Sequence, residues 1–493
     1  MATDSEVVTT RSEEASATAP EADSLEIVVG QKLRQHDGDG ESSSMSIFRV
    51  PAHIRDANKE LYEPRLVSIG PYYRGRAALR AMEQHKWRLL RELLSNREHH
   101  PGILLGMCVK AVRGVEQHAR CCYSERTDND VEGFAEMLLL DGCFIIQFFA
   151  KLHNKEEDPL CDVGWGLPLL LSDLLLLENQ IPFRVLEELF RVVAPDAETW
   201  HLRSLLLPHI RSHFSSLYNK PSTHDVLTRL PQEIHHLLHL FYEAIVPNPR
   251  RADMVMESAR KSPSRLANKL HGWFRAAVRV RDKFTLITQD SGAGAQPPPL
   301  LLPSVTMLRE AGVRFAEKKS PRHMFDITFD KASGVMEMPR VQVDQANKPL
   351  FVNLLAFEQT SRGHGGGDQY WLSSYTALMS FLVKTGKDVE QLQKRGIMDS
   401  LLDSNDDAAT GFFQQLGLGG CSSLDYEEHR FQEMFADLRQ YYDSSWHKHK
   451  AEFLRDHCRS PWAIIALAAA MLAVGFTLFK VSTAIYSLVR PGH

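Results

Sequence analysis

The sequence has no asparagine that begins an Asn-x-Ser/Thr acceptor for N-glycosylation. It also lacks the features of a secretory leader, because residues 1–24 carry six carboxylates and the single basic residue Arg11, with no apolar core. The seven cysteines are odd in number and show neither disulfide nor metal-ligand spacing, which is typical of a reducing compartment. These absences predict that the folded part of the chain does not enter the secretory lumen.

Common catalytic signatures are absent as well. The chain has no Gly-x-Ser-x-Gly elbow, no Gly-Lys-Ser/Thr phosphate loop and no Gly-x-Gly-x-x-Gly dinucleotide motif. His235 and His239 are four apart, a spacing that would place them on one face of a helix, but no third metal ligand of similar quality accompanies them. We therefore expect no metal and no other cofactor. The net charge of −5 and the absence of a reading helix or aromatic platform predict no nucleic-acid partner.

One long hydrophobic run stands near the C-terminus. Trp462 to Phe479 is uninterrupted, and apolar character resumes after Lys480 as far as Val489. About 20 apolar helical residues cross a bilayer core, so the sequence predicts one transmembrane helix over residues 461–489, with a buried core helix as the alternative. Four basic residues precede it: Lys448, Lys450, Arg455 and Arg459. Fewer follow it, which predicts a single-pass membrane protein whose N-terminal domain is cytoplasmic, in the plasma membrane or an endomembrane.

The rest of the chain predicts a mainly α fold with a minor β-hairpin element. We expect an acidic segment over residues 1–45, a large helical domain over 46–455, and within it a basic, Pro- and Gly-rich connector at about 245–303. Phe134–Phe149 and Leu167–Phe190 are apolar almost all round, as in helices buried within a bundle, and Pro182 kinks or ends the second. Phe325–Val343 alternates around Ser333-Gly334, which predicts two short strands and a turn.

Three carboxylates, Asp141, Asp173 and Glu178, lie within these apolar segments. A buried ionised carboxylate is unfavourable unless it is paired or hydrogen-bonded, so each should have a basic or backbone partner. The functional alternative is that Asp141 and Glu178 form an acid/base pair in a cleft. Asn179 and Gln180 are expected to satisfy backbone groups where the helix breaks.

Two further charge patterns have simple interpretations. Glu83 and Lys86 are three apart, which on a helix is an ordinary surface or core-edge pair. Arg250 to Lys283 is rich in basic residues, and a basic amphipathic helix there would place Arg275, Arg279 and Lys283 against anionic lipid. The alternative is a solvated helix or linker.

Several motifs in the same order resemble the plant domain-of-unknown-function 247 family. They include Tyr62-Glu63-Pro64, Val67 to Tyr72, Asp141-Gly142-Cys143-Phe144, the Leu-Leu-Glu-Asn-Gln-Ile-Pro core that ends at Pro182, Asn353 to Gln359 with Glu358, and Ser460-Pro461-Trp462. From this motif set the candidate site residues are Asp141, Gly142, Cys143, Asp173, Glu178, Asn179, Gln180, Pro182 and Glu358. Tyr73 stands where the family often has a histidine, so a histidine at that position is no universal catalytic group.

The resemblance implies a plant single-pass membrane protein with a large helical domain and no established biochemistry. Some grass members sit at self-incompatibility loci and look like pollen determinants, which would require an exposed domain, whereas the flanking charges favour the cytosol. We expect recognition of an unknown protein partner, or signalling, at a membrane. The alternatives are an enzyme that uses Asp141 and Glu178, and a peripheral adaptor for anionic lipid.

Overall fold

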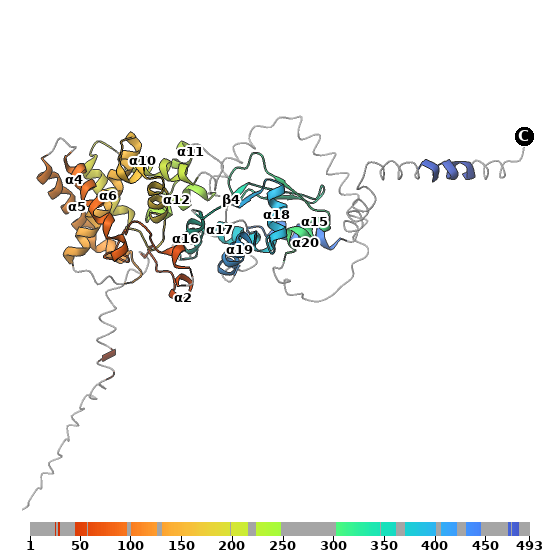
Figure 1. Cartoon of the computed structure of the whole chain (residues 1–493), viewed down its shortest axis with the longest axis horizontal. Helices are drawn as coiled ribbons and strands as arrows, with labels where there is room; N and C mark the ends of the chain where they lie inside the picture. The colour runs from red at the N-terminus through yellow and green to blue at the C-terminus, as the bar shows by residue number, and fades with distance from the viewer. Residues whose placement is uncertain are drawn as a thin grey trace, which may run out of the picture. The chain divides into compact units, whose positions relative to one another are not determined.

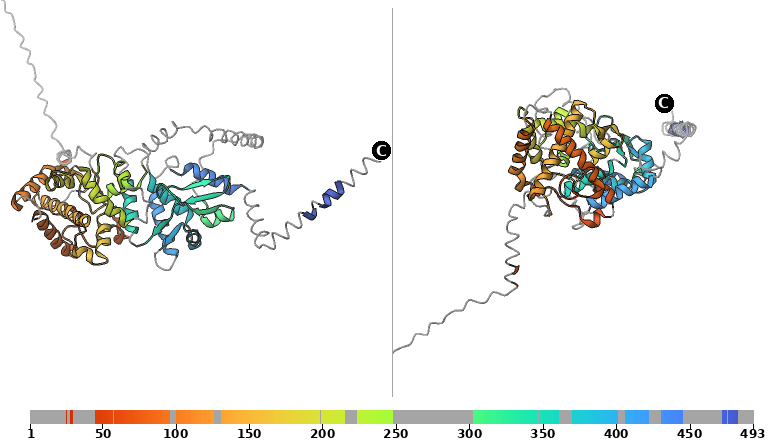
Figure 2. Two further views of the ribbon diagram at one scale, coloured as in Figure 1. Left: turned by 90° about the horizontal axis from the view of Figure 1, so that it is seen from above. Right: turned by 60° about the vertical axis from the view of Figure 1, so that its left-hand side comes forward.

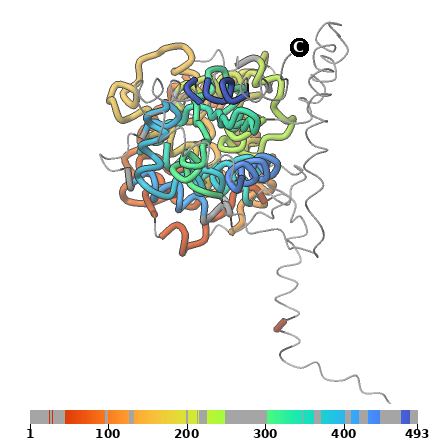
Figure 3. The backbone as a smooth tube through the Cα atoms, turned by 90° about the vertical axis from the view of Figure 1, so that its right-hand side faces the viewer, coloured from red at the N-terminus to blue at the C-terminus, as the bar shows by residue number. Residues whose placement is uncertain are grey.

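The computed structural model describes most of the chain between residues 45 and 444. The described residues are 25, 28–29, 45–56, 58–95, 100–125, 131–197, 199–214, 223–247, 302–345, 347–360, 370–400, 406–421, 430–444, 472–474 and 476–482. The chain divides into two units, Met1–Ser44 and Met45–His493. The fold below is that of the second unit, and Figure 3 traces its path.

Helices dominate this unit, as the sequence predicts. Those before the connector are α2 (Ala52–Arg55), α3 (Lys59–Tyr62), η2 (Ala77–Leu79), α4 (Arg80–Ser95), α5 (Pro101–Cys121), α6 (Val131–Asn154), α7 (Pro159–Asp162), α8 (Gly166–Asp173), α9 (Phe183–Val193), α10 (Thr199–His213), α11 (Thr223–Leu227) and α12 (Leu237–Ile245). Those after it are α15 (Val305–Glu310), α16 (Asn347–Thr360), α17 (Trp371–Leu382), α18 (Gly386–Lys394), α19 (Asp406–Cys421) and α20 (Gln432–Asp443).

Local sequence signals set several of these helix boundaries. Asp158 caps α7 by accepting a hydrogen bond from the Leu160 N–H, and Pro159 occupies the first helical position, where no backbone donor is needed. Thr385 and Asp388 form a reciprocal capping box at the start of α18. Each cap satisfies backbone N–H groups that the first turn of a helix leaves without a partner.

Helix α6 lies at the centre of the helices that precede the connector. It packs against α4, α5, α9 and α10, and most of its apolar residues are buried. Within the described residues, Gly133–Asn154 is the one stretch long and apolar enough to cross a membrane, and 78% of its most hydrophobic window is buried in the protein. The expectation that Phe134–Phe149 is a buried core helix is confirmed. The span over residues 461–489 stays a prediction, because the structure describes only a shorter apolar helix there, Leu472–Ser482.

The expectation that Leu167–Phe190 is helical up to a kink or end at Pro182 is wrong. Helix α8 ends at Asp173, α9 begins at Phe183, and the nine residues between them are turns and extended chain. Pro182 is the N-cap residue of α9, so it begins a helix. The segment is buried throughout, and buried turns need polar side chains to satisfy their backbone groups.

The β structure is a small addition after the connector (Figures 1 and 2). The strands are β1 (Arg314–Glu317), β2 (Thr328–Asp330), β3 (Val335–Met338), β4 (Val341–Val343) and β5 (Met398–Ser400). The predicted hairpin is confirmed, since β2 and β3 pair antiparallel with Phe329 opposite Met336. Gly334 closes its turn with a φ of 67°, and a β-carbon there would lie 2.3 Å from the Tyr441 hydroxyl oxygen. The sequence did not predict the parallel pairings of β1 with β3 and of β4 with β5.

Candidate functional site

Four of the family-motif residues contact one loop, Arg65 to Tyr73, which lies before α4: Asp141, Asp173, Glu178 and Asn179. Asp173 at the end of α8 accepts backbone N–H bonds from Arg65 at 3.1 Å, Leu66 at 2.6 Å and Val67 at 2.9 Å. Three donors on one carboxylate fix three successive peptide units. Burial raises the pKa of Asp173 to about 6, while these backbone donors act to lower it.

Asn179 holds the next part of the same loop. Its side-chain oxygen accepts the Ile69 N–H at 2.7 Å, and its amide nitrogen donates to the carbonyls of Val67 at 3.0 Å and Asp173 at 2.9 Å. The side chain is fully buried, and both its oxygen and its amide nitrogen are hydrogen-bonded. Asn179 therefore joins the loop to the turn that follows α8.

Gln180 connects that turn to α12 by hydrogen bonds. Its amide nitrogen donates to the carbonyls of Leu174 at 2.7 Å and Leu176 at 2.8 Å, and its side-chain oxygen accepts the Leu238 N–H at 3.2 Å. The loop comes close to this residue, because a β-carbon on Gly70 would lie 2.3 Å from the Gln180 carbonyl oxygen. Gly70 also has a φ of 76°, so only glycine fits there without strain. The expectation that Asn179 and Gln180 satisfy backbone groups is confirmed.

Asp141 reaches the loop from the middle of α6. One of its oxygens accepts the Gly70 N–H at 2.8 Å, and the other is 2.6 Å from Lys86 Nζ on α4. The Lys86 ammonium also donates to the Ser68 carbonyl and lies 2.7 Å from Glu83. Burial raises the pKa of Asp141, and the charge of Lys86 acts to lower it. The interpretation of Glu83 and Lys86 as a surface or core-edge pair is wrong for Lys86, which is 1% exposed.

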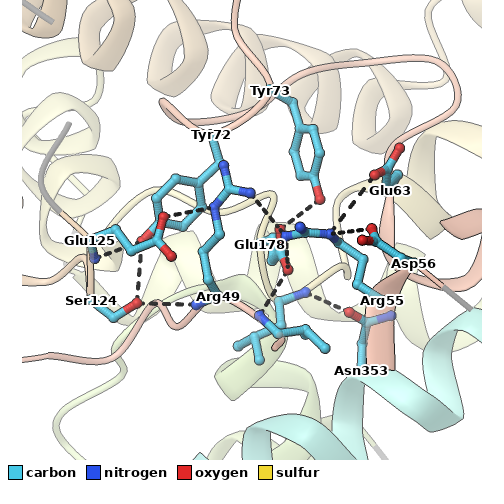
Figure 4. Close-up of polar contacts among 12 residues, drawn as sticks. Arg49, Arg55, Asp56, Glu63, Tyr72, Tyr73, Ser124, Glu125, Glu178 and Asn353 are labelled. Atoms are coloured by element: carbon cyan, nitrogen blue, oxygen red, sulfur yellow. Dashed lines mark hydrogen bonds and ion pairs between the residues drawn. The ribbon is translucent and has the colours of Figure 1, made fainter. Parts of the chain in front are cut away.

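Glu178 forms the most connected part of the site (Figure 4). It accepts the Val50 N–H at 2.8 Å and the Tyr73 hydroxyl at 2.6 Å, and Arg55 approaches both of its oxygens at 3.4 Å. Arg49 lies 3.8 Å away and stacks on Tyr72. Burial and the hydrogen bond to Glu178 raise the pKa of Tyr73 far above its ordinary value, so this hydroxyl stays a donor.

Asp141 and Glu178 thus have separate sets of partners. Asp141 binds Lys86 and Gly70, whereas Glu178 binds Val50, Tyr73 and the Arg55 guanidinium. Among the described residues no hydrogen bond or ion pair joins the two carboxylates. Their oxygens are directed at groups that hold the loop and the segment before it, which is the arrangement expected of structural carboxylates.

Gly142 and Cys143 serve the packing of α6. A β-carbon on Gly142 would lie 2.4 Å from Leu189 Cδ1, so the missing side chain lets α9 approach. Cys143 is fully buried, and its hydrogen bond with Cys108 of α5, together with burial, raises the pKa of its thiol well above the usual range. Neither residue is placed for chemistry with a ligand from solvent.

Helix α16, after the connector, contributes two further buried polar residues. Glu358 caps α17 by accepting the N–H groups of Leu372 at 2.9 Å and Ser373 at 2.6 Å, and it also accepts the Tyr242 hydroxyl at 2.6 Å. Burial raises its pKa. Asn353 accepts the Leu177 N–H at 2.9 Å, and its amide nitrogen donates to the Leu61 carbonyl at 2.8 Å. Both residues join segments on the two sides of the connector.

Asp388 is a buried carboxylate that the sequence analysis did not single out. It accepts the Thr306 N–H at 2.7 Å, and thereby caps α15 as well as α18. Burial acts to raise the pKa of Asp388, but the hydrogen bonds from Thr306 and Thr385 outweigh it and lower the pKa. The capping-box pattern Thr385-x-x-Asp388 was the available signal.

The histidine expectation needs a correction. His236 is the N-cap of α12, so His235 precedes the helix and does not share a helical face with His239. His236 is buried with its Nε2 3.1 Å from the Ser46 carbonyl, and burial lowers its pKa well below the usual value. In the part of the chain that the structure describes, no group of three metal-ligating side chains is found. The lipid-contact candidates Arg275, Arg279 and Lys283 lie outside the described residues.

Comparison with known proteins decides the family. The sequence profile of the plant domain-of-unknown-function 247 family, described as a plant protein of unknown function, matches residues 47–476. The chain belongs to this family. It is 28% identical over 459 residues to the UPF0481 protein At3g47200 of Arabidopsis thaliana, covering 91% of this chain and 87% of that protein. It is 25% identical over 516 residues to the putative UPF0481 protein At3g02645 of the same plant, covering 93% and 92%. No solved structure matches.

The raised pKa of Asp173 has a measurable consequence for this family member. Because the folded state binds a proton more tightly than the unfolded chain, the contribution of Asp173 to stability is greatest below pH 4 and declines as the pH rises to about 6. The decline amounts to about 3 kcal/mol in total. We expect the unfolding free energy of the parent to fall more steeply from pH 4 to 6 than that of Asp173→Asn, by up to about 1.4 kcal/mol per pH unit. Urea titrations at several pH values test this, and equal slopes would contradict it.

Proposed function

We propose that this chain is a single-pass membrane protein whose helical unit recognises another protein at a membrane. The observation that supports the proposal is that the family-motif carboxylates and Asn179 form hydrogen bonds to buried groups of the protein itself. Asp141, Asp173 and Asn179 accept backbone N–H groups of the loop Arg65 to Tyr73. Glu178 accepts the Tyr73 hydroxyl of that loop and the Val50 N–H of the segment before it. A scaffold stabilised in this way presents its outer helices and loops as the surface available to a partner.

Membrane attachment is supported by the short helix Leu472–Ser482. Its large apolar side chains are exposed, including Leu472 at 76% and Phe479 at 66%. A helix that exposes apolar groups all round is unfavourable in water and favourable in lipid. It lies inside the longer apolar run that begins at Trp462, which has the length for a span. Some grass members of the family look like pollen recognition determinants, which favours recognition over catalysis.

Protease protection in sealed plant microsomes tests this proposal. The full chain carries one tag at Met1 and another after His493, and protease is added from outside. We expect the chain to resist extraction by alkaline carbonate, the Met1 tag to be digested and the other tag to be protected. Release by carbonate would contradict the anchor. Protection of the Met1 tag in resistant chains would contradict the cytoplasmic orientation and favour an exposed determinant.

A further inference from the structure

Exposed apolar side chains are concentrated on the first half of α5. Of the nine large apolar residues that are exposed among the described residues between 45 and 444, four lie within seven positions of this helix: Ile103, Leu105, Met107 and Val109. Their exposed fractions run from 36% to 60%. Trp87, 47% exposed, is a fifth and belongs to the neighbouring helix α4. We call the four exposed apolar residues of α5 the α5 face.

The α5 face points away from the core. Leu104, Cys108 and Val112 form the buried stripe of α5, which packs on α6 and α9. Figure 1 shows α5 beside α6. At 100° per residue, the four exposed apolar residues of α5 cover an arc of about 200° on the other side of the helix. A partner helix in a groove uses a narrow stripe at i, i+3, i+4 and i+7. A fluid surface can contact this wide arc, because it adapts to the shape of the helix.

The charges beside this face are basic. Arg91 of α4 and Lys110 of α5 are exposed, and no carboxylate in the described part of the chain lies within ion-pair distance of either. The carboxylates of both helices are already engaged: Glu83 by Lys86, Glu92 by Arg88 and Lys151, and Glu116 by Arg113 and Arg120. The complementary surface is therefore apolar and anionic.

We propose that the α5 face lies on an anionic lipid bilayer, with its apolar side chains in the interface and Arg91 and Lys110 at the phosphate level. The inference rests on the proposed function, because a C-terminal anchor keeps the helical unit near a membrane. Exposed apolar side chains with the unpaired Lys110 among them are the composition of an interfacial helix, and the neighbouring helix α4 adds the exposed Trp87 and Arg91. A second copy of the chain is disfavoured, because each face would bring the same uncompensated positive charges.

Hydrogen–deuterium exchange of the full chain tests the inference. The protein is measured in nanodiscs with 30% anionic phospholipid, in zwitterionic nanodiscs, and in detergent at two protein concentrations. We expect the amides of Gly102–Lys110 to exchange about tenfold more slowly in the anionic nanodiscs than under the other conditions. Equal protection in both kinds of nanodisc would contradict the role of charge. Protection that depends on concentration in detergent would assign the face to a second copy and overturn the inference.

Two variants test whether the protection depends on the α5 face. Ile103→Glu with Met107→Glu should abolish the lipid-dependent protection, whereas Met307→Glu, a change at an exposed methionine on α15, should leave it unchanged. Loss of protection in both variants would contradict a specific face. A chain that does not enter nanodiscs at all contradicts the anchor, and the inference with it. A chain that enters without protection of α5 contradicts this inference alone.

Discussion

Replacing Lys86 with methionine is expected to lower the free energy of unfolding by about 3–5 kcal/mol. The variant keeps an unbranched apolar side chain one atom shorter than lysine, but it leaves Asp141 buried without its counter-charge and removes the donor to the Ser68 carbonyl. Urea unfolding of the full chain in detergent, followed by tryptophan fluorescence, measures the change. A loss below about 1 kcal/mol would show that the pair is not the main support of Asp141.

Two comparisons identify the cause of that loss. Lys110→Met makes the same chemical change at an exposed helical position, and we expect an effect within about 0.5 kcal/mol. The double variant Lys86→Met with Asp141→Leu removes both charges, so it should be more stable than Lys86→Met alone. If the double variant is less stable than the single one, the stranded charge is not the source of the loss.

Replacing Glu178 with alanine is the second change with a large expected effect, again about 3–5 kcal/mol. It leaves the Val50 N–H and the Tyr73 hydroxyl buried without their acceptor, and it removes the carboxylate that faces Arg55. The same urea titration reports the loss. The segment around Val50 should also become more accessible to protease, because its backbone bond to Glu178 is lost.

Glu125→Ala is the matched control for Glu178→Ala. Glu125 pairs with Arg49 at 3.2 Å, but its side chain is 58% exposed, so we expect a loss of at most about 1 kcal/mol. Tyr73→Phe combined with Glu178→Ala should cost less than the sum of the single changes, because both remove the same hydrogen bond. Strict additivity would contradict the contact.

Local patterns in the sequence predicted the parts of the fold that depend on neighbouring residues. The apolar run Phe134–Phe149 indicated a buried helix, and α6 is that helix, although it extends from Val131 to Asn154. Alternation around Ser333-Gly334 indicated the hairpin of β2 and β3. Both signals are periodic, and periodicity is the property that a single sequence carries most directly.

Other features depend on residues far apart in the chain, and local patterns could not reveal them. Leu167–Phe190 has the composition of one buried helix. The Gln180 amide satisfies the carbonyls of Leu174 and Leu176, and Asn353 accepts the Leu177 N–H, so a nonhelical segment can be buried there. Lys86 looked like half of a surface pair, because its partner Asp141 is 55 residues away. Its position in the apolar stripe with Met82 was the signal that it is buried.

Two long-range hydrogen bonds of Asn353 also determine how early this part of the fold can form during synthesis. This residue bonds to Leu61, 292 positions earlier, and to Leu177, 176 positions earlier. At roughly 5–20 residues per second on the ribosome, Leu61 precedes Asn353 by about 15–60 s. During that interval the segments around Leu61 and Leu177 can be stabilised only by residues that have already been synthesised. Their hydrogen bonds to Asn353 form later, in a slow step because the contacts are far apart in the sequence. Completion of the fold therefore comes late in translation.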